Sequence, residues 1–345
     1  MSRIVILRRL ALAGVLLAFG VVVFGAYVRL TAAGLGCPDW PGCYGHFTPA
    51  AAAAADAGTA ASPLHVGKAW REMIHRYAAS TLGLVILAIA VLAWRWRRQN
   101  GMPRVLPAVL VLLVLFQGLL GMLTVTLLLK PLIVTAHLVF GLLTLSLLWW
   151  LWLSLRRASS DPWSGSASAL GGGSAAALMR PASPLAIRAA TVALIALMLQ
   201  ILLGGWTSTN YAAVACPDFP QCQAQWWPAA DFKDAFVLWR GLGVNYEGGV
   251  LQQSARVAIH FTHRLGAITA ALALLLAAAL ALASRADRNS RWTAWAVLAA
   301  LALQLCIGIF MVLRGFPSGL ATAHNAGAAL LLLATLGLNR ALRRS

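Results

Sequence analysis

The chain alternates long apolar segments with short polar ones. Eight uninterrupted apolar runs have the length of about 18 to 25 residues that a helix rising 1.5 Å per residue needs to cross a hydrocarbon core of roughly 30 Å. This pattern predicts an all-α integral membrane protein with eight transmembrane helices. The runs cover residues 10–28, 74–94, 105–129, 132–155, 189–206, 257–283, 292–313 and 320–338.

Composition supports a membrane protein over a soluble one. Hydrophobic residues make up 61% of the 345 residues and charged residues only 10%, whereas a soluble surface needs far more charge. A net charge of +18 would suggest nucleic-acid binding in a soluble protein, but here the 27 basic residues gather between alternate apolar runs. We therefore expect membrane lipid, and no nucleic acid, as a partner.

The same charges predict the topology. With both termini inside, the inner segments hold 17 of the 27 basic residues and only Asp161 and Asp287 of the nine acids. The positive-inside rule then places both termini in the cytoplasm of a multi-pass protein of the bacterial inner membrane. Three arginines before the first run would also suit a cleaved signal peptide. A retained helix is favoured because the run 10–28 exceeds a signal core of about 7–15 residues.

Internal similarity divides the chain into two halves. Six residues recur at a displacement of 179 to 188 positions, and this nearly constant offset is what duplication of a four-helix unit produces. We expect two tandem pseudo-symmetric four-helix bundles, an architecture that commonly holds cofactors between facing helices. The matched pairs are Cys37 and Cys216, Cys43 and Cys222, His75 and His263, Gln117 and Gln304, Gly121 and Gly308, and His137 and His324.

The predicted boundaries follow from the join between the repeats. An N-terminal half is assigned to residues 1–157 and a C-terminal half to residues 187–345. The stretch 158–186 contains paired serines and a Gly-Gly-Gly-Ser run, so it is interpreted as a flexible cytoplasmic linker.

Four of the seven histidines occupy matching places. His75, His137, His263 and His324 lie in the first turns of even-numbered predicted helices, all of which start at the outer face. A single intramembrane histidine could pack between helices or relay protons. Two per half at equivalent positions are better explained as pairs that ligate one haem iron each, His75 with His137 and His263 with His324. Zinc is less suitable because a closed zinc site needs about four ligands.

Arg76 and Arg264 directly follow His75 and His263 in the outer headgroup zone. A guanidinium can form paired hydrogen bonds with a carboxylate, and haem propionates are the carboxylates expected there. Snorkelling of the arginines to the interface is the alternative. Recurrence of the arginine at the same place in both halves favours propionate binding. Gly121 and Gly308 would make room for the macrocycle.

The repeat breaks at one position of chemical interest. Glu72 stands three residues before His75, whereas the second half has His260 three residues before His263. Residues at this spacing share a helix face, so Glu72 would lie about one turn from the iron ligand. There a carboxylate could position or deprotonate a water, although a favourable charge near a helix N-terminus is the simpler alternative. We predict that Glu72 is catalytic and that the second half holds a permanent haem that relays electrons, with His260 outside the ligand shell.

The outer loops also contain two cysteine pairs, Cys37 with Cys43 and Cys216 with Cys222. They could form disulfides, bind a metal or exchange electrons with a partner. Disulfides are favoured because an oxidising compartment permits them and the intervening loops are short. Cys306, alone in the seventh run, is expected to act as a small apolar residue.

Together these motifs resemble the haem A synthase family over nearly the whole chain. The resemblance rests on Gly25-x-Tyr27-Val28-Arg29-Leu30-Thr31, Gly34-Leu35-Gly36-Cys37-Pro38-Asp39-Trp40-Pro41, Glu72-x-x-His75-Arg76, Ala136-His137, Thr262-His263-Arg264 and Ala323-His324-Asn325.

The resemblance implies oxidation of the C8 methyl of haem O to a formyl group by successive hydroxylations, which makes haem A for terminal oxidases. It further implies that the N-terminal half binds substrate haem O through His75 and His137 with Glu72 catalytic, and that the C-terminal half binds haem b through His263 and His324. Expected partners are a haem O synthase as substrate donor, an unidentified electron donor and a second copy of the chain in a homo-oligomer.

Two other functions compete with this interpretation. A di-haem b-type electron carrier typically has haems near both membrane faces, whereas all four candidate ligands here lie toward one face. A haem-delivery protein or transporter could also use a duplicated bundle. Neither requires a carboxylate confined to one half.

Overall fold

The computed structural model describes residues 3–56, 65–158, 183–284 and 287–344, and its regular elements in these ranges are helices. Three short ones, α2 (Pro49–Asp56), η2 (Ala213–Ala215) and α7 (Phe232–Ala235), lie in connections. Eight others are long and apolar enough to cross a membrane, which confirms the predicted all-α architecture. These are α1 (Arg3–Leu30), α3 (Val66–Arg95), α4 (Val105–Thr126), α5 (Pro131–Ala158), α6 (Pro184–Thr209), α8 (Gln253–Ala283), α9 (Arg288–Leu313) and α10 (Ser318–Leu342).

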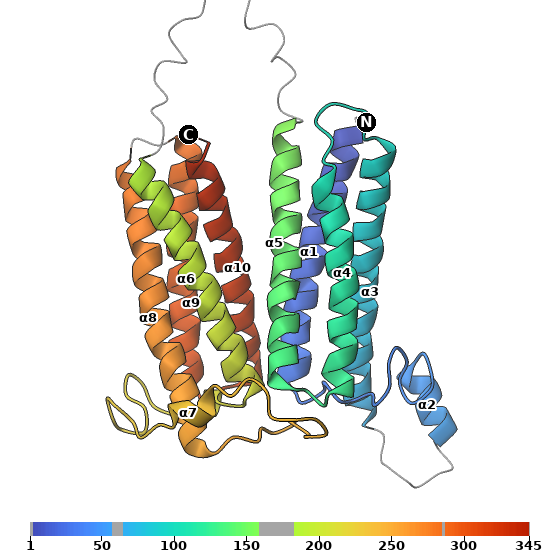
Figure 1. The fold of residues 1–345 in the computed structure, drawn as a ribbon, viewed down its shortest axis with the longest axis vertical. Helices are drawn as coiled ribbons and strands as arrows, with labels where there is room; N and C mark the ends of the chain where they lie inside the picture. The colour runs from blue at the N-terminus through green and yellow to red at the C-terminus, as the bar shows by residue number, and fades with distance from the viewer. Residues whose placement is uncertain (1–2, 57–64, 159–182, 285–286, 345) are drawn as a thin grey trace, which may run out of the picture.

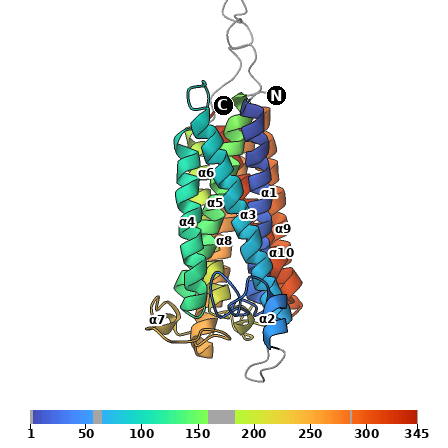
Figure 2. The same ribbon diagram turned by 90° about the vertical axis from the view of Figure 1, so that its right-hand side faces the viewer.

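The long helices stand in two groups. Helices α1, α3, α4 and α5 form the first group, and α6, α8, α9 and α10 form the second beside it (Figures 1 and 2). Both termini lie at one end of the molecule, and the loops that contain the cysteine pairs lie at the other, which we call the disulfide end. The predicted linker falls mostly on residues 159–182, outside the described residues. Its margins are helical, because α5 reaches Ala158 and α6 begins at Pro184.

Several helices begin earlier than the apolar runs. Helix α3 starts at Val66, eight residues before the run 74–94, and α8 starts at Gln253, four before the run 257–283. Hydropathy marks only the part of a helix in hydrocarbon, whereas a helix satisfies its own backbone groups and continues into the polar layer. As a result His75 and His263 lie in the third turn of their helices, deeper along the helix than predicted.

Helix α4 ends before its apolar run does. It stops at Thr126, and Leu128 and Leu129 take left-handed backbone angles with φ of 50° and 60°. The backbone N–H of Leu129 donates to the carbonyl of Thr124 at 2.8 Å, which closes the helix end. The chain has to reverse before Pro131 begins α5, so apolar content alone could not place this boundary.

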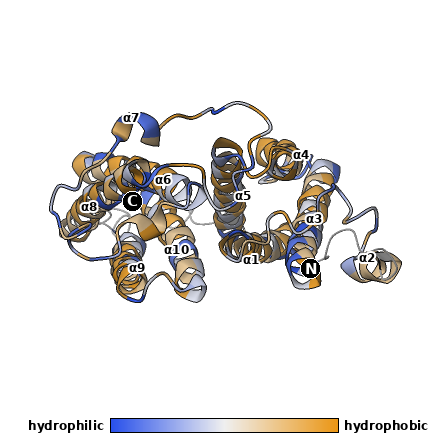
Figure 3. Cartoon of the chain, turned by 90° about the horizontal axis from the view of Figure 1, so that it is seen from below, coloured by the Kyte–Doolittle hydropathy of each residue, from blue (hydrophilic) through white to orange (hydrophobic). Residues whose placement is uncertain are grey.

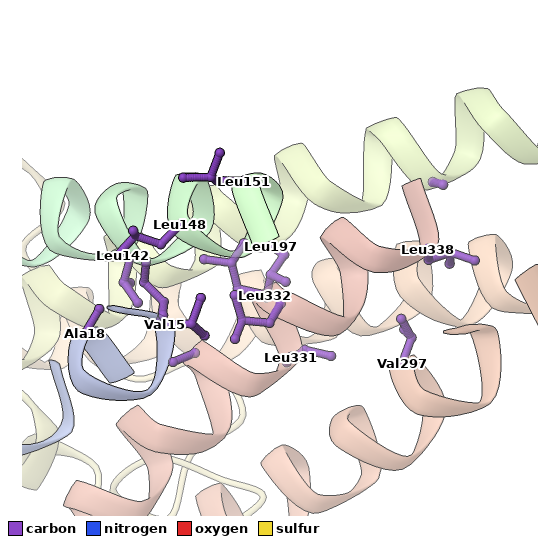
Figure 4. Packing of buried hydrophobic residues seen from close by; sticks show 14 of the residues in the cluster. Val15, Ala18, Leu142, Leu148, Leu151, Leu197, Val297, Leu331, Leu332 and Leu338 are labelled. Carbon is purple, nitrogen blue, oxygen red and sulfur yellow. The ribbon is translucent and has the colours of Figure 1, made fainter. Parts of the chain in front are cut away.

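A continuous apolar core joins the two groups. Leu148 and Leu151 of α5 meet Leu197 of α6 and Leu332 of α10 in one cluster, shown in Figure 4. Viewed from the disulfide end, the outward helix faces are largely apolar as well (Figure 3). Exposed leucines such as Leu84 and Leu276 mark faces that would be insoluble in water and are suited to lipid. The protein is therefore a multi-pass membrane protein.

Buried cations also tie the groups together. Near the disulfide end, the Arg29 side chain of α1 donates to the carbonyl of Ser208 in α6 at 3.0 Å. Near the other end, Arg340 of α10 donates to the carbonyl of Trp150 in α5 at 3.1 Å. The carbonyl of Ser208 lies at the end of α6, where the helix dipole favours a cation, whereas that of Trp150 lies within α5. In an apolar setting both carbonyls are suitable partners for a guanidinium.

The loop that follows α7 crosses from the second group to the first at the disulfide end (Figure 3). The backbone N–H of Tyr246 donates to the carbonyl of Leu128 at 3.1 Å. The buried ammonium of Lys130 donates to the carbonyl of Gly241 and lies 3.4 Å from the centroid of the Trp239 ring. These contacts cover the ends of α4 and α5 and fix the second group's loop over the first group.

Candidate functional site: two histidine pairs near the disulfide end

Each helix group contains one pair of histidines on different helices. His137 of α5 and His324 of α10 both lie six residues beyond the first residue of their helix. His137 lies within electrostatic range of His75 from α3, and His263 of α8 lies within range of His324. The structure thus brings together the predicted partners in each half, toward the disulfide end of the helices.

A glycine on the neighbouring helix lies against each imidazole. A Cβ built on Gly25 of α1 would lie 2.7 Å from Cε1 of His75, and one on Gly204 of α6 would lie 3.2 Å from Cε1 of His263. Only a residue without a side chain permits this approach, so the glycines of α1 and α6 determine where the rings can lie.

Gly121 and Gly308 do the same for the other two histidines. A Cβ on Gly308 would lie 2.9 Å from Cε1 of His324, whereas one on Gly121 would lie at an ordinary 3.6 Å from Cε1 of His137. Room for a macrocycle beside these glycines stays a prediction. In the structure their contact is with the imidazole rings themselves.

Glu72 joins the first histidine pair to a cysteine loop. Its Oε2 accepts from the backbone N–H of Cys37 at 2.9 Å, and its Oε1 accepts from Nη2 of Arg76 at 2.5 Å. The Glu72 side chain is only 6% exposed. It is the seventh residue of α3, beyond the first turn, so the simple helix-terminus interpretation does not account for it. Two fixed donors hold the carboxylate in one orientation, three residues before His75.

The arginines that follow the histidines contact the cysteine loops. Nη1 of Arg76 donates to the carbonyls of Asp39 at 3.0 Å and Gly42 at 2.5 Å. Nη2 of Arg264 donates to the carbonyls of Cys216 at 2.9 Å and Asp218 at 2.7 Å. Each guanidinium therefore holds its loop against the helix that carries the adjacent histidine.

The second group has a different residue in place of the carboxylate. His260 is buried, its Nε2 lies 3.4 Å from Nε of Arg264, and its ring meets Phe316 edge to face at 5.9 Å between centroids. The charged contact of the first group is replaced here by an uncharged acceptor. Among the described residues, an acid three residues before the histidine occurs only in the first group.

Both cysteine pairs form disulfides in the structure. The Sγ atoms of Cys37 and Cys43 are 2.01 Å apart, and those of Cys216 and Cys222 are 1.94 Å apart. All four cysteines are buried. Cys306 of α9 is a free, exposed thiol on an apolar helix face.

Several buried imidazole nitrogens have no hydrogen-bond partner. Nδ1 of His75, His137 and His324 is buried without a hydrogen-bond partner, and so is Nδ1 of His260, so this feature is shared by the proposed ligands but is not confined to them. A buried polar group without a partner is costly, and a metal that binds the imidazole gives it one. Among the described residues, no three His, Cys, Asp or Glu side chains cluster closely enough to hold a metal ion. Each pair can therefore supply two ligands, the number that a haem iron takes from protein.

Sequence reasoning missed part of this environment. Gly204 was not singled out, although the displacement of 179 between the cysteine loops aligns it with Gly25. Gln200, one turn before Gly204, also escaped notice because it has no counterpart in the first half: the same displacement leads to Val21. Its Nε2 lies 3.0 Å from Nδ1 of His263.

Comparison with known proteins gives one consistent result. Residues 8–336 match the family described as cytochrome oxidase assembly protein. A heme A synthase of Shewanella oneidensis is 42% identical over 92% of this chain and 91% of its own length. Heme A synthases of Rhizorhabdus wittichii and Shouchella clausii are 30% and 28% identical over 93% and 78% of this chain, and the matches cover 89% and 78% of those proteins.

Proposed function

The chain belongs to the cytochrome oxidase assembly protein family, and from this premise we propose that it is a haem A synthase, an oxidoreductase of the bacterial inner membrane. It oxidises the C8 methyl of haem O to a formyl group. The observation that carries the proposal is a pair of half-buried histidines in each helix group, with a fixed carboxylate, Glu72, beside only the first of the two pairs among the described residues. Both termini then lie in the cytoplasm, and the disulfide end faces outward.

The residues present fit two haems. The glycines that lie against the rings leave each imidazole little freedom to move, and Nδ1 of three of these four rings is left without a hydrogen-bond partner. We assign substrate haem O to His75 and His137, and resident haem b to His263 and His324. Arg76 and Arg264 remain the candidates for propionate contacts at this depth, and the loop carbonyls orient them.

Glu72 is the group that distinguishes the two sites chemically. The residues at positions 72 and 75 are separated by about 4.5 Å along the helix axis, so the carboxylate would lie about one helix turn from the iron of a haem held by His75. The N–H of Cys37 and the guanidinium of Arg76 fix both oxygens of Glu72, which can then hold a water or accept its proton beside the substrate methyl. Haem b, when bound, supplies one-electron transfer. The His260 side has no carboxylate for such a proton.

The partners belong to the same proposal. A haem O synthase would deliver the substrate, an electron-transfer partner would exchange electrons with the second site, and a second copy of the chain would complete a homo-oligomer. A b-type electron carrier, the main rival, has no use for an acid beside one pair only.

Haem extraction tests the proposed activity directly. Membranes of a host that makes haem O but no haem A are expected to gain haem A, at the expense of haem O, when this chain is expressed. Reversed-phase chromatography of the extracted haems measures both. His137→Ala, which removes a substrate ligand, is the control and is expected to leave haem O unchanged. Haem A production by that variant, or none by the unaltered chain at equal expression, contradicts the proposal.

The glycine contacts give a graded prediction. Gly25→Ala is expected to displace His75, because the new Cβ would lie 2.7 Å from its ring, and to weaken haem binding at the first site by about tenfold or more. Gly121→Ala is the matched control, because its Cβ would make an ordinary 3.6 Å contact with His137. Absorbance titration of the purified proteins with haem compares them. Equal affinities in the two variants would show that the close approach of Gly25 has no role in ligand placement.

A further inference from the structure

The two histidine pairs differ in what contacts their ring nitrogens. In the second group, Nε2 of Gln200 lies 3.0 Å from Nδ1 of His263 and also donates to its backbone carbonyl at 3.0 Å. Nε2 of Gln304 lies 3.3 Å from Nε2 of His324, whose Nδ1 has no hydrogen-bond partner. Both imidazoles of this pair therefore have a side-chain amide within hydrogen-bonding distance.

The first pair has no such contact within the ranges that the structure describes. Gln117, which aligns with Gln304, donates to the backbone carbonyl of His137 at 3.0 Å and makes no hydrogen bond to its ring. The His75 ring lies against Gly25 and, at 6.4 Å between centroids, the ring of Phe24. Packing alone holds these two imidazoles.

A pair of linked differences in the sequence explains the contrast at His263 and His75. Gln200 lies one turn before Gly204, and Val21 stands at the matching place one turn before Gly25. Residues four apart share a helix face, so position 21 points toward the same neighbour as Gly25 does. Valine cannot donate or accept a hydrogen bond there.

The second difference is on the histidine's own helix. Gly266 stands three residues after His263, and Ala78 stands three residues after His75. A Cβ on Gly266 would overlap Oε1 of Gln200, closer than any real contact. Gly266 therefore leaves room for the amide of Gln200. The first half has neither this glutamine nor this glycine.

Hydrogen bonds from outside the ligand shell restrain ligand imidazoles, and their loss typically weakens metal binding about 10- to 100-fold. A glutamine amide contains a donor and an acceptor, and Oε1 of Gln200 and of Gln304 is buried without a partner. The same side chain can therefore serve the ring whichever nitrogen bears the proton.

We propose that Gln200, admitted by Gly266 and assisted by Gln304, is a positioning residue that makes the second site retain its haem. Val21 and Ala78 leave His75 without this restraint, which suits a site that must take up substrate and release product. This inference rests on the proposed function, because it assigns an exchangeable haem to one pair and a resident haem to the other.

The test measures how fast haem leaves the full-length protein in detergent. Gln200→Val and Gly266→Ala are expected to transfer resident haem to excess apomyoglobin about 10- to 100-fold faster than the unaltered chain. Their electron paramagnetic resonance spectra should also show a shifted low-spin signal, which a purely structural role would not produce. Gln117→Leu, on the first side, is the matched control and should leave resident haem release unchanged.

Introducing the second-site residues into the first site gives a test that does not depend on loss of function through misfolding. Val21→Gln combined with Ala78→Gly is expected to slow release of haem from the first site. Release from Gln200→Val and Gly266→Ala within about twofold of the unaltered rate would overturn the inference. The proposed function fails separately, if His263→Ala itself keeps the resident haem. Should Gln200→Val not fold, Gly266→Ala and the reciprocal pair still decide the matter.

Discussion

Glu72→Gln is expected to abolish conversion of haem O to haem A while both haems stay bound. Loss of a positioned general base commonly lowers a rate by about 10²- to 10⁴-fold, and the second group has His260 rather than an acid at the equivalent position. Glutamine keeps one oxygen that can accept from the N–H of Cys37 but cannot take a proton. Haem chromatography of membranes gives the product, and absorbance of the purified variant gives the haem content.

A loop control separates catalysis from anchoring, since Glu72 also holds the Cys37 loop. Asp39 accepts from the backbone N–H groups of Tyr44 at 2.6 Å and Gly45 at 2.9 Å, and it does not contact Glu72. Asp39→Asn should disturb the loop and leave haem A formation measurable. If Glu72→Gln makes haem A at the unaltered rate, Glu72 has no part in the chemistry. If Asp39→Asn loses product equally, the loop and not the carboxylate is responsible.

His263→Ala and His324→Ala are each expected to remove the resident haem b. Each imidazole supplies one of the two protein ligands, and no group of three His, Cys, Asp or Glu side chains among the described residues could hold the metal instead. Reduced-minus-oxidised spectra of purified protein should lose the low-spin signal of this site. Imidazole added to the medium is expected to restore part of it in His324→Ala, because the small ring can occupy the space beside Gly308.

His260→Ala is the matched control for these variants. His260 is more buried than the four proposed ligands and lies three residues from His263, but its ring contacts Arg264 and Phe316. The His260→Ala variant should keep the haem spectrum of the unaltered protein. A spectrum that survives in both His263→Ala and His324→Ala would refute the ligand assignment, and a loss in His260→Ala would move His260 into the ligand shell.

Hydropathy located all eight long helices but could not place their ends. The start of α3 at Val66 and the end of α4 at Thr126 differ from the apolar runs in opposite directions. The first difference arises because a helix extends past the hydrocarbon. The second arises because the chain reverses before Pro131. Both depend on backbone hydrogen bonding, which residue composition does not report.

The sequence could predict which histidines are equivalent, because the repeat offset matches His75 with His263 and His137 with His324. Each half then contains two such histidines, which are predicted to form one pair. The hydrogen-bond partners of Arg76 and Arg264 could not be predicted in the same way. Propionates were expected from their position, and the structure adds the loop carbonyls of Asp39 and Cys216 as acceptors. A carbonyl leaves no mark in the sequence, so backbone acceptors of this kind emerge only from the folded loop.

The sequence by itself determined the number of spans and the residue types that can bind iron or accept a proton. Those features depend on composition, spacing and chemical identity, all of which are local. Only the tertiary structure decided that Glu72 is held by Cys37, that glycines of α1 and α6 limit the imidazoles, and that Gln200 contacts His263. Such contacts join residues far apart in the chain, and close packing of the helices alone fixes them.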